Sequence, residues 1–300
     1  MSEPIILADN LVKIYKTKEL EVLALQGLDL SVEAGELMAI IGNSGSGKST
    51  FLNMIGGLDR PSAGKLFVDQ KNLFALSDRD LVEYKKKTVG FVWQNNARNL
   101  LPYLSAYENI LTPMHFSSEK KKKEHANHLL DLVGMSHRKH NRLNQLSGGE
   151  QQRIAIAIAL ANNPKVLLAD EPTGSVDRKT ADYILDVFKN LNRELGLTII
   201  IVTHDVQLSK KVQRVVAIRD GKISSERIMK EAYTANYDEK AVDWTSVEED
   251  DVQDEFVVVD RAGRIQLPRE YLDSLSLKDN KVKVEYVDKK IVIENPEITE

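Results

Sequence analysis

The fold is decided by the stretch Met38-Ala39-Ile40-Ile41-Gly42-Asn43-Ser44-Gly45-Ser46-Gly47-Lys48-Ser49-Thr50. Its second part matches GxxxxGKS, the pattern of a phosphate-binding loop. The glycines allow positive φ values, so successive backbone N–H groups converge on phosphate oxygens at the positive end of the next helix. The apolar run before the loop is typical of a buried parallel strand, and residues 50–55 continue as a helix. The stretch therefore predicts a nucleotide-phosphate site between a strand and a helix.

Two side chains of this loop have distinct predicted roles. Lys48 is expected to contact the β- and γ-phosphates of a nucleotide. Ser49 is expected to give its hydroxyl to Mg²⁺, which prefers an octahedral shell of oxygen ligands. With glycine at its average usage of about 7%, a chance match in a chain of this length has a probability of roughly 1%. An idle glycine turn is therefore a weak alternative.

Composition indicates the class of protein. The 300 residues, 42% hydrophobic and 29% charged, can bury a full core and a second, smaller domain. A net charge of −4 gives no overall attraction to nucleic acid. There is no run of about eighteen apolar residues and no basic-then-apolar start, so we expect neither a membrane span nor a signal peptide. The absence of cysteine excludes disulfides and thiolate metal sites and fits a cytosolic location.

Polar side chains end three further predicted strands. Asp170 and Glu171 follow one apolar run, Gln94 ends a second and His204 a third. Neighbouring side chains on a strand point to opposite faces, so the two acids can differ in role: Asp170 suits Mg²⁺ through water, and Glu171 suits deprotonating an attacking water. Because carboxyl ends of parallel strands meet at a ligand crevice, we expect all four there. Capping of the next helix is the alternative for the acids.

A second glycine-rich helix start follows at Leu146-Ser147-Gly148-Gly149-Glu150. Ser147 is expected to cap a helix whose free N–H groups could face an anion, although an ordinary capped helix is the alternative.

Tyr15 lies upstream of the phosphate loop, between antiparallel strands predicted at residues 5–8 and 28–32. Its ring could stack on adenine, but a tyrosine at a strand end is by default a packing residue. Both readings stay open.

Together these residues resemble the ATP-binding cassette family, the ATPase subunits of ABC transporters. The resemblance covers about residues 5 to 225. It rests on the phosphate loop, Gln94, the LSGGE sequence, Leu167-Leu168-Ala169-Asp170-Glu171-Pro172, Ser175-Val176-Asp177 and His204, in the family's order and approximate spacing. It implies an α/β P-loop NTPase fold of the ABC ATPase type over residues 1–228, with a mixed sheet and a helical subdomain at about 95–160.

The resemblance also implies a role for each motif residue in ATP hydrolysis with Mg²⁺. Tyr15 is similar to the aromatic residue that stacks on adenine, and Gln94 to the glutamine that binds Mg²⁺ and couples the site to transport. Asp170 matches the acid near Mg²⁺ and Glu171 the catalytic base. His204 matches the residue that senses the γ-phosphate.

In this family the LSGGE sequence contacts the nucleotide on the opposite subunit, so the resemblance implies a head-to-tail homodimer with two ATP molecules between the copies. Residues 56–64 and 89–94 are similar to the branch that serves macrolide export and lipoprotein release with FtsX-like permeases. That branch implies a cytoplasmic protein at the inner face of the membrane. Three departures from the usual sequence of this branch limit the assignment of a specific permease and cargo. They are the longer segment of residues 95–102, Ile158 where an arginine is common, and Ser175-Val176 in place of Asn-Leu.

The composition changes beyond residue 228. Residues 229–253 are acidic and without periodicity, which predicts a linker. Residues 254–300 predict a small β-rich domain with strands at 256–259, 281–286 and 291–294 and a short helix to Leu275. Gly263-Arg264-Ile265-Gln266-Leu267-Pro268 and the closing hairpin resemble the AbrB-like swapped-hairpin domain, with Ser276 and Asn280 where glycines are common.

About forty residues cannot build a good core alone, so we expect residues 254–296 to form an intertwined homodimer that holds two cassettes together without ATP. The alternative function is an ATP-controlled DNA-binding or regulatory protein, since AbrB-like domains often bind DNA. A DNA reader needs clustered Lys and Arg, but here acids balance them, so no specific nucleic acid is expected. A chromosome-maintenance or translation-factor cassette is disfavoured by the single cassette and the lack of a long heptad insert.

Overall fold

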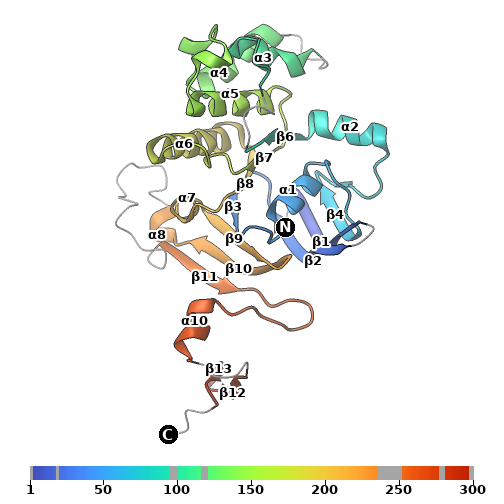
Figure 1. Cartoon of the computed structure of the whole chain (residues 1–300), viewed down its shortest axis with the longest axis vertical. Helices are drawn as coiled ribbons and strands as arrows, with labels where there is room; N and C mark the ends of the chain where they lie inside the picture. Colours follow the sequence, from blue (N-terminus) through green and yellow to red (C-terminus); the bar gives the residue numbers. More distant parts are fainter. Residues whose placement is uncertain are drawn as a thin grey trace. The chain divides into compact units, whose positions relative to one another are not determined.

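The computed structural model describes residues 3–17, 20–94, 100–115, 121–234, 252–276 and 281–296 (Figure 1). The chain divides into two units, Met1–Phe256 and Val257–Glu300, which we call the cassette and the tail. Residues 95–99, the first part of the longer segment noted at 95–102, and residues 235–251 of the predicted linker lie outside the described residues.

A seven-stranded sheet forms the centre of the cassette, in the order β11-β10-β9-β3-β8-β7-β6. Strand β3 runs parallel to β8 and β9, and β7 runs parallel to β6 and β8, whereas β10 is antiparallel to β9. Their bounds are β3 Leu37–Ile41, β6 Val89–Val92, β7 Val166–Asp170, β8 Thr198–Val202, β9 Arg214–Arg219, β10 Lys222–Met229 and β11 Gln253–Val257. The carboxyl ends of β3, β6, β7 and β8 consequently meet at one edge, as the sequence predicts.

A second, four-stranded sheet has the order β2-β1-β4-β5 and is antiparallel throughout. Its strands are β1 Ile6–Lys16, β2 Glu21–Val32, β4 Ala63–Val68 and β5 Lys71–Asn72. The predicted strands at residues 5–8 and 28–32 are therefore parts of longer strands.

Helices cover both faces of the central sheet. The helices in the described part of the cassette are α1 Lys48–Ile55, α2 Asp78–Lys87, α3 Ala106–Met114, α4 Lys122–Leu132, α5 Gly148–Leu160, α6 Arg178–Leu195, α7 Val206–Ser209 and α8 Glu231–Thr234, with short 3₁₀ turns at Ser136–Arg138 and Leu143–Gln145. Helices α3, α4 and α5 occupy the region where the sequence predicts a helical subdomain. Helix α6 is amphipathic, and the residues on its buried side include Ile184, Phe188 and Leu191.

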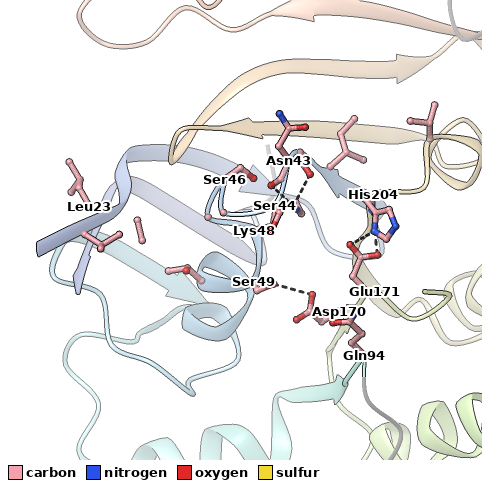
Figure 2. Close-up of a pocket in the computed structure, with 18 residues that line it drawn as sticks. Leu23, Asn43, Ser44, Ser46, Lys48, Ser49, Gln94, Asp170, Glu171 and His204 are labelled. Atoms are coloured by element: carbon pink, nitrogen blue, oxygen red, sulfur yellow. Dashed lines mark hydrogen bonds and ion pairs between the residues drawn. The ribbon is translucent and has the colours of Figure 1, made fainter. Parts of the chain in front are cut away.

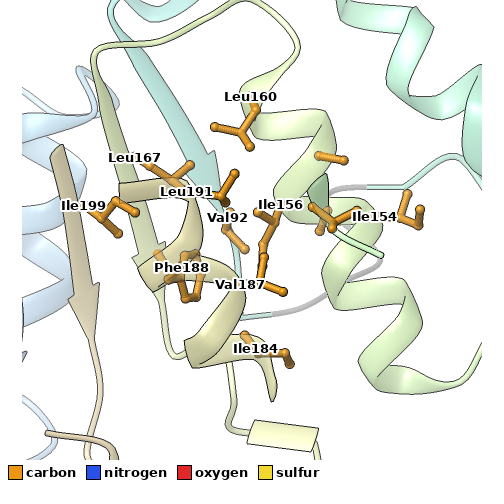
Figure 3. Packing of buried hydrophobic residues seen from close by; sticks show 14 of the residues in the cluster. Val92, Ile154, Ile156, Leu160, Leu167, Ile184, Val187, Phe188, Leu191 and Ile199 are labelled. Atoms are coloured by element: carbon orange, nitrogen blue, oxygen red, sulfur yellow. The ribbon is translucent and has the colours of Figure 1, made fainter. Parts of the chain in front are cut away.

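Alternate residues of the central strands face two separate cores. Ile199 and Ile201 of β8 pack with α5 and α6 in the first core, which Figure 3 shows from close by. Ile200 and Val202 pack in the second core with α1 and the four-stranded sheet. Because both faces are covered, the strand is apolar without interruption rather than alternating. This double burial holds the strand ends, and the side chains that follow them, in place.

The tail contains helix α10 Arg269–Ser274 and the hairpin of β12 Lys283–Val287 with β13 Lys290–Glu294. One prediction differs from the structure. The strand expected at residues 256–259, as the first of the tail, is instead β11, which begins at Gln253 and pairs with β10 in the cassette sheet. Its apolar pattern predicts a strand but cannot name a distant partner. The partner is available because β10 would otherwise end the sheet.

Candidate nucleotide-binding and catalytic site

A cavity of about 790 Å³ opens at the carboxyl ends of the central strands. It brings together most of the predicted site residues from four separate parts of the sequence (Figure 2). Its lining consists of Val22, Leu23, Ala24, Ile41, Gly42, Asn43, Ser44, Gly45, Ser46, Gly47, Lys48, Ser49, Thr50, Gln94, Asp170, Glu171, His204 and Val206. Tyr15 and residues Ser147 to Glu150 are the predicted site residues that do not line it.

The phosphate loop needs glycine at two crowded positions. Gly42 and Gly47 have φ values of 150° and 106°. A Cβ on Gly42 would lie 2.2 Å from the Ile218 carbonyl oxygen, and one on Gly47 would lie 2.7 Å from the Ala24 carbonyl oxygen. The loop therefore curls tightly against β9 and β2, and only glycine fits these points. Helix α1 begins directly after the loop, so its N-terminus faces the cavity.

Lys48 is bonded to its own loop. Its ammonium donates to the Gly42 carbonyl at 2.7 Å and to the Asn43 carbonyl at 2.9 Å. Burial lowers the pKa of Lys48, while the charges of Glu171 and Asp170 oppose that shift. A phosphate group entering the cavity would replace these neutral carbonyl partners with a charge-assisted contact, which is the stronger kind.

Asp170 and Ser49 form the part of the site that suits a cation. The Ser49 hydroxyl donates to Asp170 Oδ1 at 3.2 Å. Burial raises the pKa of Asp170, and the Glu171 charge adds to this, while the Ser49 hydrogen bond and Lys48 act in the opposite direction. With Gln94 on the same wall, the donors are hydroxyl, carboxylate and amide oxygens. This set fits Mg²⁺, which is commonly bound by one or two carboxylates together with substrate phosphates.

Glu171 lies one residue beyond β7 in a strained backbone conformation, with φ of 47°. Its N–H donates to the Val202 carbonyl at 2.8 Å, which fixes the turn against β8. Its Oε1 lies 2.8 Å from His204 Nδ1, and its Oε2 accepts from the His204 backbone N–H at 3.4 Å. The carboxylate is 13% exposed and the imidazole 71%. Glu171 is thus held by His204 while it still faces the cavity, as a general base must.

Tyr15 lies beside the cavity rather than on its wall. It pairs across the sheet with Val22, which does line the cavity, and opposite residues of an antiparallel pair share a face. The Tyr15 hydroxyl donates to Asp59 Oδ2 at 2.7 Å, and the Lys13 ammonium lies 4.7 Å from the ring centroid. The Lys13 ammonium also contacts Asp59 at 2.6 Å. Packing and adenine stacking are both compatible with this placement, so the role of Tyr15 stays a prediction.

Sequence reasoning missed the residues that surround Tyr15. Val22 and Leu23 are about half exposed and give the cavity an apolar wall next to the loop. The available signal is the run of four apolar residues, Val22-Leu23-Ala24-Leu25, near the start of a strand whose second half alternates with polar residues. Lys13 and Asp59 carried no such signal, because their contact joins residues 46 positions apart.

The LSGGE sequence forms a well-capped helix start. Ser147 accepts from the Glu150 N–H at 3.3 Å, and Glu150 accepts in return from the Ser147 N–H at 2.8 Å, which is a capping box. Arg138 contacts Glu150 at 3.0 Å. Gly149 packs so closely on α6 that a Cβ would lie 2.2 Å from Thr180 Cγ2. This start is rigid and lies apart from the cavity of its own chain.

Comparison with known proteins identifies relatives of this arrangement. A family model described as "ABC transporter" matches residues 25–174. An uncharacterised ABC transporter ATP-binding protein of Thermotoga maritima is 47% identical over 213 residues, which cover 70% of this chain and 90% of that protein. The macrolide export ATP-binding/permease protein MacB of Syntrophobacter fumaroxidans is 43% identical over 218 residues, which cover 71% of this chain and 30% of MacB.

A solved structure resembles the chain over the same extent. It is a dimer of an ATP-binding cassette in a post-hydrolysis state, bound to ADP and inorganic phosphate. The TM-score is 0.67 at 39% identity, covering 74% of this chain and 97% of the solved one. With the family model and the site geometry in agreement, the chain belongs to the ATP-binding proteins of ABC transporters, and it is an ATPase.

Proposed function

We propose that two copies of this chain form a head-to-tail dimer that hydrolyses ATP and thereby powers a membrane permease. The observation that best supports hydrolysis at this site is the Glu171–His204 pair, which holds a carboxylate at the cavity opposite the phosphate loop. The helix start at Ser147 lies outside that cavity and is the part that a second copy would supply. The dimeric relative described above supports this assembly.

In the proposed mechanism, Glu171 would accept a proton from the water that attacks the γ-phosphorus, as the bond from that phosphorus to the ADP oxygen breaks. Lys48 and the N–H groups of the loop would hold the phosphate oxygens and stabilise their charge. His204 would keep the Glu171 carboxylate oriented. Ser49, Asp170 and Gln94 would hold Mg²⁺, which when bound neutralises charge on the β- and γ-phosphates.

Substitution of Glu171 tests this proposal. Glu171→Gln keeps the shape of the side chain but cannot accept the proton, so we expect turnover to fall by about 10²-fold or more while ATP affinity stays within about threefold. Lys48→Ala should instead weaken ATP binding, through loss of the cation. Glu83→Gln, an exposed acid of α2 paired with Lys87, is the matched control and should leave turnover unchanged. Wild-type turnover in Glu171→Gln would refute the assignment.

The proposal also covers the kind of permease that this chain works with. Among the described residues no helix is both long and apolar enough to cross a membrane. MacB is named an ATP-binding/permease protein, and this chain spans 30% of its length. We propose a separate FtsX-like permease and a position at the inner face of the cytoplasmic membrane. Co-purification from membranes with the product of a neighbouring permease gene would support this, and recovery without any permease would contradict it.

The proposal also assigns a role to the tail. We propose that it is an AbrB-like dimerisation domain that keeps two cassettes near each other when ATP is gone. In its described residues the hairpin carries as many basic as acidic side chains, namely Lys283, Lys289 and Lys290 against Glu285, Asp288 and Glu294. A surface of this kind gives no cluster of positive charge for a nucleic acid. The DNA-binding alternative is therefore not adopted.

A further inference from the structure

The hairpin of the tail has two chemically different faces. Its register pairs Val284 with Ile293 and Tyr286 with Ile291, and directly opposite residues share a face. These four apolar side chains therefore lie on one face. The other face carries Val287 and Val292 together with the charged residues of both strands. These charged residues are Lys283, Glu285, Lys290 and Glu294.

The apolar face is open to solvent. Val284 is 60% exposed, Ile291 71% and Tyr286 75%. Within the described part of the tail, β12 and β13 have only each other as strand neighbours. A two-stranded hairpin is marginally stable alone, whereas three or more strands with an apolar face can be stable. Further strands from another chain segment would therefore stabilise the hairpin.

The outer edge of β13 is complementary to itself. Its sequence is Lys290-Ile291-Val292-Ile293-Glu294. If two copies pair antiparallel about a twofold axis at Val292, Lys290 faces Glu294 of the second copy at both ends, and Ile291 faces Ile293. Opposite charges and apolar residues at facing positions both stabilise a sheet. In the register centred on Val292, the charged residues and the apolar residues of the two copies therefore both face suitable partners.

Other pairings fail on the same criteria. The same operation on β12, Lys283-Val284-Glu285-Tyr286-Val287, places Glu285 against its own copy, and like charges at facing positions are destabilising. A shift of β13 by one residue turns its apolar residues toward the charged face of the partner. A shift of two residues keeps the faces but loses both charge pairs. Of these pairings, β13 in the central register is the one that keeps the faces matched, sets Ile291 opposite Ile293 and forms both charge pairs.

We propose that the tails of two copies pair through β13, which joins the two hairpins into a four-stranded antiparallel sheet. Each Ile291 then gains Ile293 of the second copy as a cross-strand neighbour. Each Glu294 lies between Lys283 of its own chain, which it faces in the hairpin, and Lys290 of the second copy. The inference rests on the proposed dimer of cassettes and gives its tail a defined interface.

A disulfide can report this interface, because the chain has no cysteine of its own. Val292→Cys places one thiol on the proposed axis, where facing residues have Cβ atoms about 5 Å apart. Glu285→Cys is the matched control, since residue 285 faces 292 in the hairpin and shares its face. Its two copies would lie three strand spacings apart, about 14 Å, beyond the reach of a disulfide.

The full-length variants are oxidised at low micromolar concentration without nucleotide and in EDTA, and then run on a non-reducing gel. We expect most Val292→Cys to become a covalent dimer and Glu285→Cys to stay monomeric. Equal cross-linking of the two variants, or none in Val292→Cys, would overturn the proposal. ATP turnover of the same unoxidised samples is measured separately, so failure of the tail interface cannot be confused with failure of the ATPase assignment.

Charge reversal gives an independent test by sedimentation of the full chain without nucleotide. Lys290→Glu places two like-charge pairs in the interface and should weaken self-association by roughly tenfold or more. Addition of Glu294→Lys restores opposite charges across the axis and should recover at least about threefold, although the pair with Lys283 is lost. Lys289→Glu, in the hairpin turn, is the control. Equal association of Lys290→Glu and Lys289→Glu would contradict pairing through β13.

Discussion

Strands β8 and β13 share a centre of three β-branched apolar residues but lie in opposite surroundings. β8 reads Thr198-Ile199-Ile200-Ile201-Val202 and has no exposed apolar side chain, whereas Ile291 of β13 is 71% exposed. In the cassette, two helical layers and a second sheet cover both faces of the strand. In the tail, the chain supplies two strands and one short helix in its described residues. Apolar β-branched residues thus specify a strand, but only the surrounding elements decide whether one chain is enough to bury it.

The largest effect is expected from a matched pair of truncations. Ile200→Ala leaves a cavity in the second core and should lower the free energy of unfolding of the cassette by about 3 kcal/mol. Ile291→Ala should change the free energy of unfolding of the cassette very little, because this side chain is 71% exposed. Urea denaturation at concentrations where the chain is monomeric measures both. A comparable loss in Ile291→Ala would show that the cassette depends on the tail hairpin.

A second comparison concerns charge. Arg214 of β9 bonds Glu36 at 2.9 Å, contacts Glu226 and donates to the Ser31 carbonyl at 2.9 Å. Burial alone would lower its pKa, but the two glutamates outweigh this and raise it. Arg214→Ala leaves these acids half-buried without their partner and should cost about 2 kcal/mol.

Lys283 of the tail is the exposed counterpart, paired with Glu285 at 2.6 Å. Lys283→Ala should give no measurable change in urea denaturation, because solvent screens such pairs. If both substitutions were neutral, the network around Arg214 would not contribute to the stability of the cassette.

A smaller change than those at Ile200 and Arg214 is expected at the nucleotide site itself. Because burial raises the pKa of Asp170 above its unfolded value, this group stabilises the fold most below the unfolded pKa, and that contribution is lost as pH rises through the folded pKa. Asp170→Asn removes a buried charge and should raise the melting temperature of the nucleotide-free protein by about 1–2 °C near pH 7. The gain should shrink toward about pH 4. A loss of stability near neutral pH would show that the Ser49 hydrogen bond outweighs burial.

Local patterns predicted much of the cassette and of the site. The phosphate loop, the acids after β7 and His204 after β8 could be found because a motif and a strand end are both local features. Three details could not be predicted. The positive φ of Glu171, the bonds of Lys48 to its own loop and the Lys13–Asp59–Tyr15 contacts all depend on where distant segments pack.

In the tail, too, the local sequence predicted strands but not their distant partners. Apolar alternation predicted its hairpin, and β12 and β13 lie within two residues of the expected strands. The pattern of residues 256–259 also predicted a strand. It could not reveal that this strand begins at Gln253 and belongs to the cassette sheet, since strand pairing over a long sequence separation leaves no local trace.

The place of β11 has a practical consequence for anyone who shortens this chain. Val252 and Gln253 are buried, and the Gln253 amide donates to the Ser209 and Val212 carbonyls at 3.2 and 3.0 Å. Truncation at residue 228, the predicted end of the ATPase domain, would remove β11 and leave the hydrogen-bonding groups of β10 open to other chains. Open strands of this kind promote aggregation. A shortened protein that keeps residues up to 257 should stay soluble, whereas one that stops at 228 should precipitate.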